Sequence, residues 1–156
     1  MNNKQQIQKL RDNAELAMAS YGYFHLIGKK FKNDSIYKGR ENTEITLYDI
    51  LDLTYKDYVT TDHTMLINPE YLKGDFTPTQ AKRFFERYDL LIHQPNTKSG
   101  FSATLFSEKR KQKDTESKEI KYTNKYGYIN YILAIISTES KEVVWMNDIA
   151  IIAFVA

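Results

Sequence analysis

The chain has 156 residues, of which 42% are hydrophobic and 13% aromatic, and this content suffices for the core of one globular domain. Lysine and arginine number 22 against 20 aspartate and glutamate residues. The resulting net charge of +2 excludes a protein that binds nucleic acid or anionic membranes through bulk charge alone. The absence of cysteine excludes disulfides, thiolate nucleophiles and cysteine-ligated zinc.

The N-terminal residues, Met1–Leu10, are polar and contain no apolar segment of the kind that a secretory signal peptide has. Nowhere does the sequence reach the roughly 18 consecutive apolar residues that a transmembrane helix needs. These features predict a protein without a transmembrane segment that is cytoplasmic or exported by a leaderless route.

Helix patterns dominate the first part of the chain, and residues 1–89 are predicted to be helical. Thr46-Leu-Tyr-Asp49 resembles a capping box, and Thr77-Pro78-Thr79-Gln80 combines a capping threonine with proline at the first helical position. Before them, apolar or small residues recur at spacings of three and four, which predicts one buried stripe of an amphipathic helix. The stripe consists of Ile7, Leu10, Ala14, Ala17, Met18, Tyr21 and Phe24.

Strand patterns follow, and strands are predicted between residues 90 and 140. Leu90–His93 is a short apolar run, and apolar and polar residues then alternate from Phe101 to Phe106. Residues 107–125 are mostly polar, which predicts a mobile, solvated loop. The segment Tyr128–Ile136 ends in a continuous apolar run, which predicts a strand covered on both faces, as in an α/β sheet.

The last segment, residues 148–156, is almost entirely apolar. Chain termini are ordinarily polar and exposed. This segment therefore predicts either a terminal core element or the place where a longer protein was cut. Left uncovered, it would promote self-association through this apolar end.

Two segments, Ser99–Phe106 and Tyr131–Ser140, resemble the paired strands that precede the oxyanion loop in class 3, fungal-type lipases. Ala14–Tyr21 similarly resembles the N-terminal helix of these enzymes, and Asn147-Asp148 resembles the acidic position after the loop. The resemblance implies an α/β fold in which N-terminal helices precede a partial mixed sheet, as in an incomplete α/β-hydrolase. The activity that it implies is hydrolysis of lipid esters.

Thr138 falls on the oxyanion-hole position of the family, where a hydroxyl and a backbone N–H stabilise the charge that develops on the carbonyl oxygen. Ile136 and Ser137 stand where the family has Arg-Gly, so the loop lacks both the anchoring arginine and the conformational freedom of glycine. The alternative interpretation of Thr138 is an ordinary hydroxyl at the end of a strand.

The sequence contains no nucleophile elbow of the Gly-x-Ser-x-Gly type, because no two of its glycines are four residues apart. In the family, the elbow, the catalytic acid and the histidine all follow the oxyanion loop. The resemblance therefore implies a single N-terminal portion of a lipase-like domain, with no serine nucleophile and no ester hydrolase activity alone. The six glycines are Gly22, Gly28, Gly39, Gly74, Gly100 and Gly127.

The histidines, His25, His63 and His93, lie far apart and show no metal-ligand spacing such as His-Glu-x-x-His. His25 is predicted to pack on an aromatic helix face, and His63 to lie in a turn. The sequence therefore predicts no metal site, and no pattern in it indicates a cofactor.

Basic and aromatic residues interleave in Lys121–Tyr131, close to the basic run Lys109–Lys113, a combination that can stack bases and pair with phosphates. The neighbouring acids Asp114, Glu116 and Glu119 argue against nucleic acid as the partner. The alternative to a hydrolase is therefore a complete, non-enzymatic binding module that uses this basic, tyrosine-rich surface.

Overall fold

The computed structural model describes residues 1–60, 70–98, 100–137 and 148–155. The chain divides into two compact units. The sheet unit combines Met1–Ser20 with Arg83–Ala156, and the inserted unit is Tyr21–Lys82. Nothing in the sequence indicated this division, because the inserted unit has no boundary marked by a linker or a change of composition.

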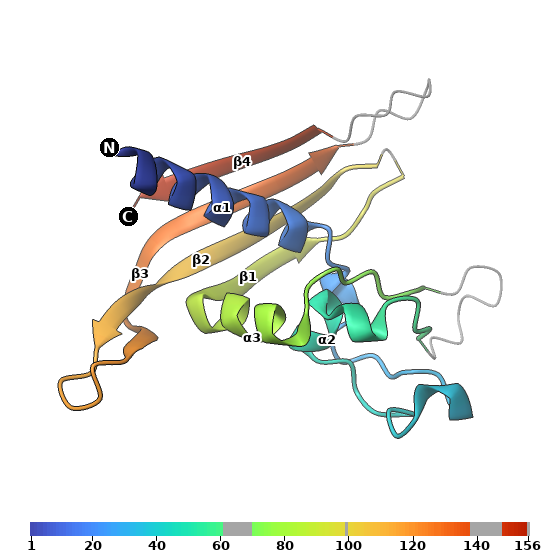
Figure 1. Ribbon diagram of the computed structural model, residues 1–156. Coiled ribbons are helices and arrows are strands. Elements are labelled where there is room, and N and C mark those ends of the chain that lie inside the picture. The colour runs from blue at the N-terminus through green and yellow to red at the C-terminus, as the bar shows by residue number, and fades with distance from the viewer. Residues whose placement is uncertain (61–69, 99, 138–147, 156) are drawn as a thin grey trace. The chain divides into compact units, whose positions relative to one another are not determined.

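The sheet unit is built on a four-stranded sheet of β1 (Tyr88–Gln94), β2 (Ser102–Lys113), β3 (Ile120–Ser137) and β4 (Asp148–Val155), in that spatial order (Figure 1). The expected combination of helices and strands is confirmed. The expected mixed sheet is not found, because every pairing between these strands is antiparallel. Each connection is shorter than the dozen or more residues that a parallel crossover requires, so antiparallel pairing follows from the connection lengths.

The polar segment 107–125 is mostly strand, and the prediction of a mobile loop is wrong. β2 continues to Lys113 and pairs with the start of β3, where Lys111 lies opposite Tyr122. Only a short turn remains between the strands, and there the Asp114 carboxylate accepts hydrogen bonds from the backbone of Glu116 and Ser117. The ladder satisfies the backbone while charged side chains stay in water, so polarity alone did not indicate disorder.

Burial alternates along β3. Ile132, Ala134 and Ile136 are buried, whereas Leu133 and Ile135 are half-buried. The expectation that both faces of this strand are covered is therefore wrong for the described residues, since one face packs against helices and the other is partly open. The buried face continues onto the paired positions of β2, which are Ser102, Thr104 and Phe106.

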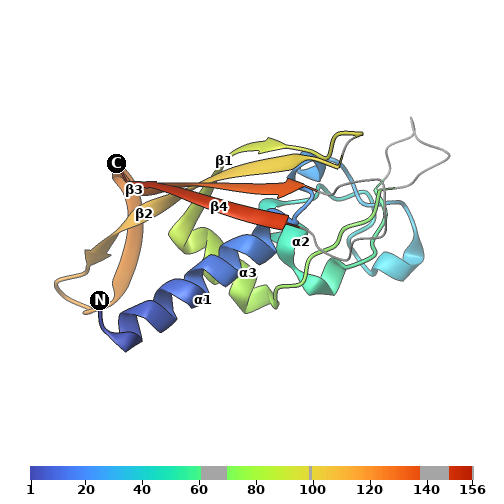
Figure 2. The same ribbon diagram turned by 90° about the horizontal axis from the view of Figure 1, so that it is seen from above.

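Helix α1 (Asn3–Ser20) contacts β3 and β4 and lies on the same side of the sheet as the last turn of α3 (Pro78–Arg87) (Figure 2). α3 begins where the sequence predicted. The hydroxyl of Thr77 accepts a hydrogen bond of 3.2 Å from the backbone N–H of Gln80, and Pro78 is the first helical residue. β1 begins at the residue directly after this helix, so no loop separates Arg87 from Tyr88.

The predicted α1 helix is confirmed, but its predicted packing face is wrong. Ile7 and Leu10 are 67% and 69% exposed, and the residues that α1 buries are Leu16, Ala19 and Ser20. The face that is buried carries Leu16 and Ala19 together with the carboxylates of Asp12 and Glu15, which pair with arginines of α3.

The inserted unit consists of short helical segments around an apolar core. Among its described residues, the longest helix that lies wholly within this unit is α2 (Leu47–Leu51). The predicted capping box is confirmed: the Thr46 hydroxyl accepts from the Asp49 backbone and the Asp49 carboxylate accepts from the Thr46 backbone. The 3-10 segments of this unit are η1 (Phe24–Leu26), η2 (Ser35–Tyr37) and η3 (Leu53–Tyr55). Its buried apolar residues are Phe24, Leu26, Phe31, Tyr37, Ile45, Ile50, Leu51, Leu72 and Phe76.

Among the residues that the structure describes, no helix combines the length and the apolar character needed to cross a bilayer.

Candidate functional site

The position that the resemblance singled out, Thr138, lies outside the described residues, and so does His63. β3 is described as far as Ser137.

The other two histidines have different surroundings. In the inserted unit, Nε2 of His25 lies 2.9 Å from Oε1 of Glu70, whose other oxygen accepts a hydrogen bond of 3.1 Å from Lys29. Burial raises the pKa of Glu70, but the hydrogen bonds from His25 and Lys29 outweigh it and hold that pKa below its ordinary value. Nδ1 of His25 is buried, although the side chain as a whole is 24% exposed. The Glu70 carboxylate therefore fixes the orientation of this imidazole.

His93 on β1 pairs with Thr104 across the sheet, with 2.9 Å between Nδ1 and the hydroxyl oxygen. Thr104 is only 1% exposed, and Nε2 of His93 is buried. An imidazole beside a hydroxyl is the pairing that activates a nucleophile. Here the hydroxyl is closed off from any ester in solution, so the pair is part of the packed sheet.

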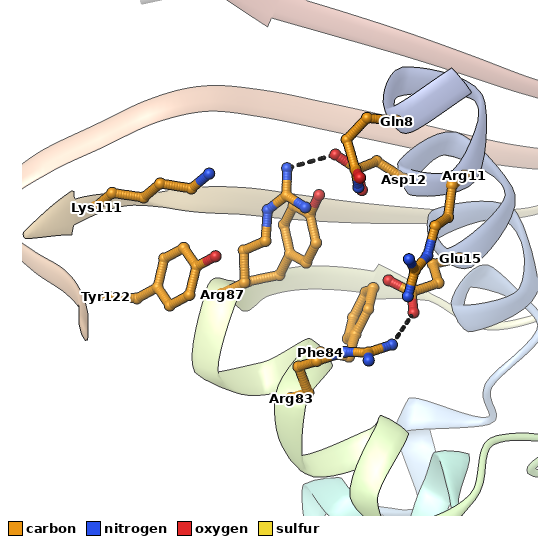
Figure 3. A pocket seen from close by; sticks show the side chains of 10 residues that line it. Gln8, Arg11, Asp12, Glu15, Arg83, Phe84, Arg87, Lys111 and Tyr122 are labelled. Atoms are coloured by element: carbon orange, nitrogen blue, oxygen red, sulfur yellow. Dashed lines mark hydrogen bonds and ion pairs between the residues drawn. The ribbon is translucent and has the colours of Figure 1, made fainter. Parts of the chain in front are cut away.

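A polar pocket of about 290 Å³ opens in the sheet unit between α1, the last turn of α3 and the extended arms of β2 and β3 (Figure 3). Its lining comprises four cationic side chains, two carboxylates, three aromatic residues and one glutamine. The lining residues are Gln8, Arg11, Asp12, Glu15, Arg83, Phe84, Arg87, Tyr88, Lys111 and Tyr122.

Arg87 is the central cation of this pocket. Its Nη2 lies 2.7 Å from Oδ2 of Asp12 and 2.7 Å from Oε1 of Glu108, to which its Nε also donates at 2.9 Å. The guanidinium carbon lies 4.9 Å from the centre of the Tyr88 ring. Glu108 accepts a further hydrogen bond of 2.7 Å from Asn130. Arg87 thus links α3 to α1 through Asp12 and to β2 through Glu108. These contacts hold its guanidinium in a fixed orientation.

The charges in the pocket are stabilised by one another. Burial lowers the pKa of Arg87, but its hydrogen bonds to Asp12 and Glu108 more than compensate and raise that pKa above its ordinary value. Burial raises the pKa of Asp12, and hydrogen bonds from Arg87 and Gln8, with the nearby Lys111, bring it below its ordinary value. Both groups therefore remain charged throughout the neutral range.

A second, more exposed pair joins the same two helices, with 2.7 Å between Nη2 of Arg83 and Oε1 of Glu15. Arg83 is 53% exposed, so solvent screens this pair more strongly than the pair of Arg87 and Asp12. The remaining cations, Arg11 and Lys111, are exposed and form no ion pair within the part of the chain that the structure describes. They are therefore available to an incoming anion.

Sequence reasoning singled out only the Lys111 and Tyr122 side of this pocket, as part of the basic, tyrosine-rich segment. The helical side was missed, although the spacing contains a signal. Arg83 and Arg87 are four residues apart on α3, and Asp12 and Glu15 are three apart on α1, so each pair shares one helix face. Two arginines on one face of a helix and two carboxylates on one face of another favour an arrangement in which these two faces meet.

Comparisons with protein families, with curated proteins and with solved structures find no match to this chain. Within the described ranges, no group of three or more histidine, aspartate and glutamate side chains could hold a metal ion.

Proposed function

We propose that this chain corresponds to the N-terminal part of a lipase-type α/β-hydrolase, and that alone it does not hydrolyse esters. The observation that supports the proposal is the pairing of the two segments that carry the resemblance. Ser102 pairs with Ile136 and Phe106 with Ile132, so the segments run as neighbouring antiparallel strands, as the resemblance requires of the strands before an oxyanion loop.

Lack of activity follows from the chemistry that acyl transfer needs. A serine hydroxyl must be activated by an accessible base, and it is presented on an elbow flanked by small residues. The glycine spacing rules out a Gly-x-Ser-x-Gly elbow. Of the described histidines, His25 pairs with the Glu70 carboxylate and His93 with the buried hydroxyl of Thr104, and neither of these partners is a serine on such an elbow.

An esterase assay tests the proposal. The chain should release no p-nitrophenol from p-nitrophenyl butyrate or p-nitrophenyl palmitate above the rate of a heat-denatured control. Turnover above this background would contradict the proposed lack of activity. The DNA that follows codon 156 tests the ancestry: a stretch encoding Gly-x-Ser-x-Gly in any frame supports it, and an unrelated gene opposes it.

A complete, non-enzymatic binding module is the second candidate, and the observation that favours it is the extended hairpin of β2 and β3. This hairpin is built from the basic, tyrosine-rich residues, and Lys111 and Tyr122 on it line the pocket. Solution behaviour separates the candidates. A monomer with one cooperative melting transition favours the module, whereas self-association favours part of a larger domain, because unpaired sheet edges associate.

A further inference from the structure

We propose that the pocket lined by Arg11, Arg87 and Lys111 is a binding site for a phosphomonoester, a small molecule with one terminal phosphate group. The proposal is independent of whether the chain derives from a hydrolase. It rests on the charge of the pocket, the direction from which each cation comes, and the size of the pocket.

The charge balance of the pocket favours an anion. Four cationic side chains line it against the carboxylates of Asp12 and Glu15. If Glu108, which also accepts a hydrogen bond from Arg87, is counted, one net positive charge remains. The acids are already satisfied by Arg87 and Arg83, whereas Arg11 and Lys111 form no ion pair with any described residue. These two are the cations that an incoming anion would neutralise.

The cations come from separate elements, which suits a tetrahedral oxyanion better than a planar one. In Figure 3 the side chain of Arg11 descends from α1 beside Glu15, Arg87 rises from α3, and Lys111 extends from β2 on the other side. A planar carboxylate is satisfied by one guanidinium fork, and the fork of Arg87 is already taken up by its two carboxylates. A phosphate group has enough oxygens to accept from several donors at once.

The size and the walls of the pocket indicate what the phosphate is attached to. About 290 Å³ is near the lower end of the range of about 300–1,000 Å³ for small-molecule sites, and it exceeds the space that one phosphate group fills. Of the three aromatic residues beside the cations, Phe84 and Tyr88 are almost fully buried, so the half-buried Tyr122 is the one that offers a ring face to a ligand. Burial raises the pKa of Tyr88, so its hydroxyl stays protonated. The remaining space therefore suits a small ring or short carbon chain.

Calorimetric titration with phenyl phosphate at low, matched ionic strength tests the site. Saturable binding with one equivalent is expected, with inorganic phosphate binding more weakly because it leaves the ring of Tyr122 uncovered. Arg11→Gln and Lys111→Gln should each weaken binding about tenfold, the loss expected for one hydrogen bond to a charged group. Both residues are exposed and unpaired among the described residues, so both variants should keep the melting temperature of the wild type.

Lys9→Gln is the matched control, because Lys9 is exposed on the same helix and does not line the pocket. Its affinity should equal that of the wild type. Three results would overturn the proposal: no saturable binding of phenyl phosphate, equal weakening by Lys9→Gln, or benzoate binding as tightly as phenyl phosphate. Tighter binding of calcium than of phenyl phosphate would identify a cation site instead and would also overturn it.

Discussion

Arg87 and Asp12 are 75 residues apart in the sequence, and their side chains form a hydrogen-bonded ion pair of 2.7 Å between α3 and α1. Both side chains are largely buried, at 20% and 17% exposed. The contact between these helices in the sheet unit therefore includes a partly buried ion pair.

Arg87→Met should lower the free energy of unfolding by about 2–4 kcal/mol, because it leaves Asp12 and Glu108 without their cation in a partly buried place. Urea unfolding followed by circular dichroism measures the change. Arg83→Met is the matched control on the same helix, and its more exposed pair should contribute less than about 1 kcal/mol. Equal losses in the two variants would contradict the central role of Arg87.

Stability should depend on pH through Asp12. Its pKa in the folded protein is below the ordinary value of 3.8, so its contribution is complete above that value and is lost as the pH falls through the lower, folded-state pKa. The stability difference between the wild type and Asp12→Asn should therefore be larger at pH 5 than at pH 2.5. A difference that does not change with pH would show that the ionised carboxylate is not what stabilises the contact.

Gly74→Ala should destabilise the inserted unit by about 1–3 kcal/mol, because a Cβ atom there would lie 2.4 Å from the carbonyl carbon of Leu51. The backbones cannot separate freely, since the Phe76 N–H donates to the Leu51 carbonyl at 2.8 Å. Thermal unfolding measures the effect. Gly39→Ala is the comparison: it has open space but a φ of 83°, so it should cost about 1–2 kcal/mol through backbone strain alone.

Arg40→Lys should lower the free energy of unfolding by about 1–2 kcal/mol although the charge is kept. The guanidinium makes two hydrogen bonds to Asp49, of 3.1 and 2.6 Å, and lies 4.8 and 4.6 Å from the ring centres of Phe31 and Tyr55. An ammonium group reproduces neither the fork nor the stacking. Arg83→Lys, with its single exposed pair, should be nearly neutral, and a neutral Arg40→Lys would contradict this account.

Hydrogen exchange should distinguish the extended hairpin from the loop that composition suggested. Backbone amides that bond across β2 and β3 between residues 107 and 113 should exchange more slowly than those of the turn at residues 114–119. Uniformly fast exchange over 107–125 would restore the original prediction of a mobile segment.

The elements that sequence predicted correctly are those with local signals. The capping box at Thr46 and the capping threonine with Pro78 specify helix starts through hydrogen bonds within four residues, and both are found. The apolar run that ends at Ile136 likewise marks β3. Such signals depend only on neighbouring residues in the chain, so they can be recognised from the sequence before the fold is known.

The features that were missed depend on partners distant in sequence. The carboxylates on the buried face of α1 pair with arginines more than 60 residues later, and the polar ends of β2 and β3 pair with each other. The pocket depends both on contacts between helices and on strand pairing, because its cations come from two helices and a strand. Thr138 remains a prediction of the resemblance.

The long sequence separation between Asp12 and Arg87 also constrains the order of folding. Bringing α1 and α3 together closes a loop that contains the whole of residues 21–82, and the entropy cost of closure rises with the length of the flexible segment. If residues 21–82 have already folded, the flexible part of this loop is shorter and the entropy cost of closing it is smaller. We therefore expect the inserted unit to acquire its structure first and the α1–α3 ion pairs to be among the last contacts made.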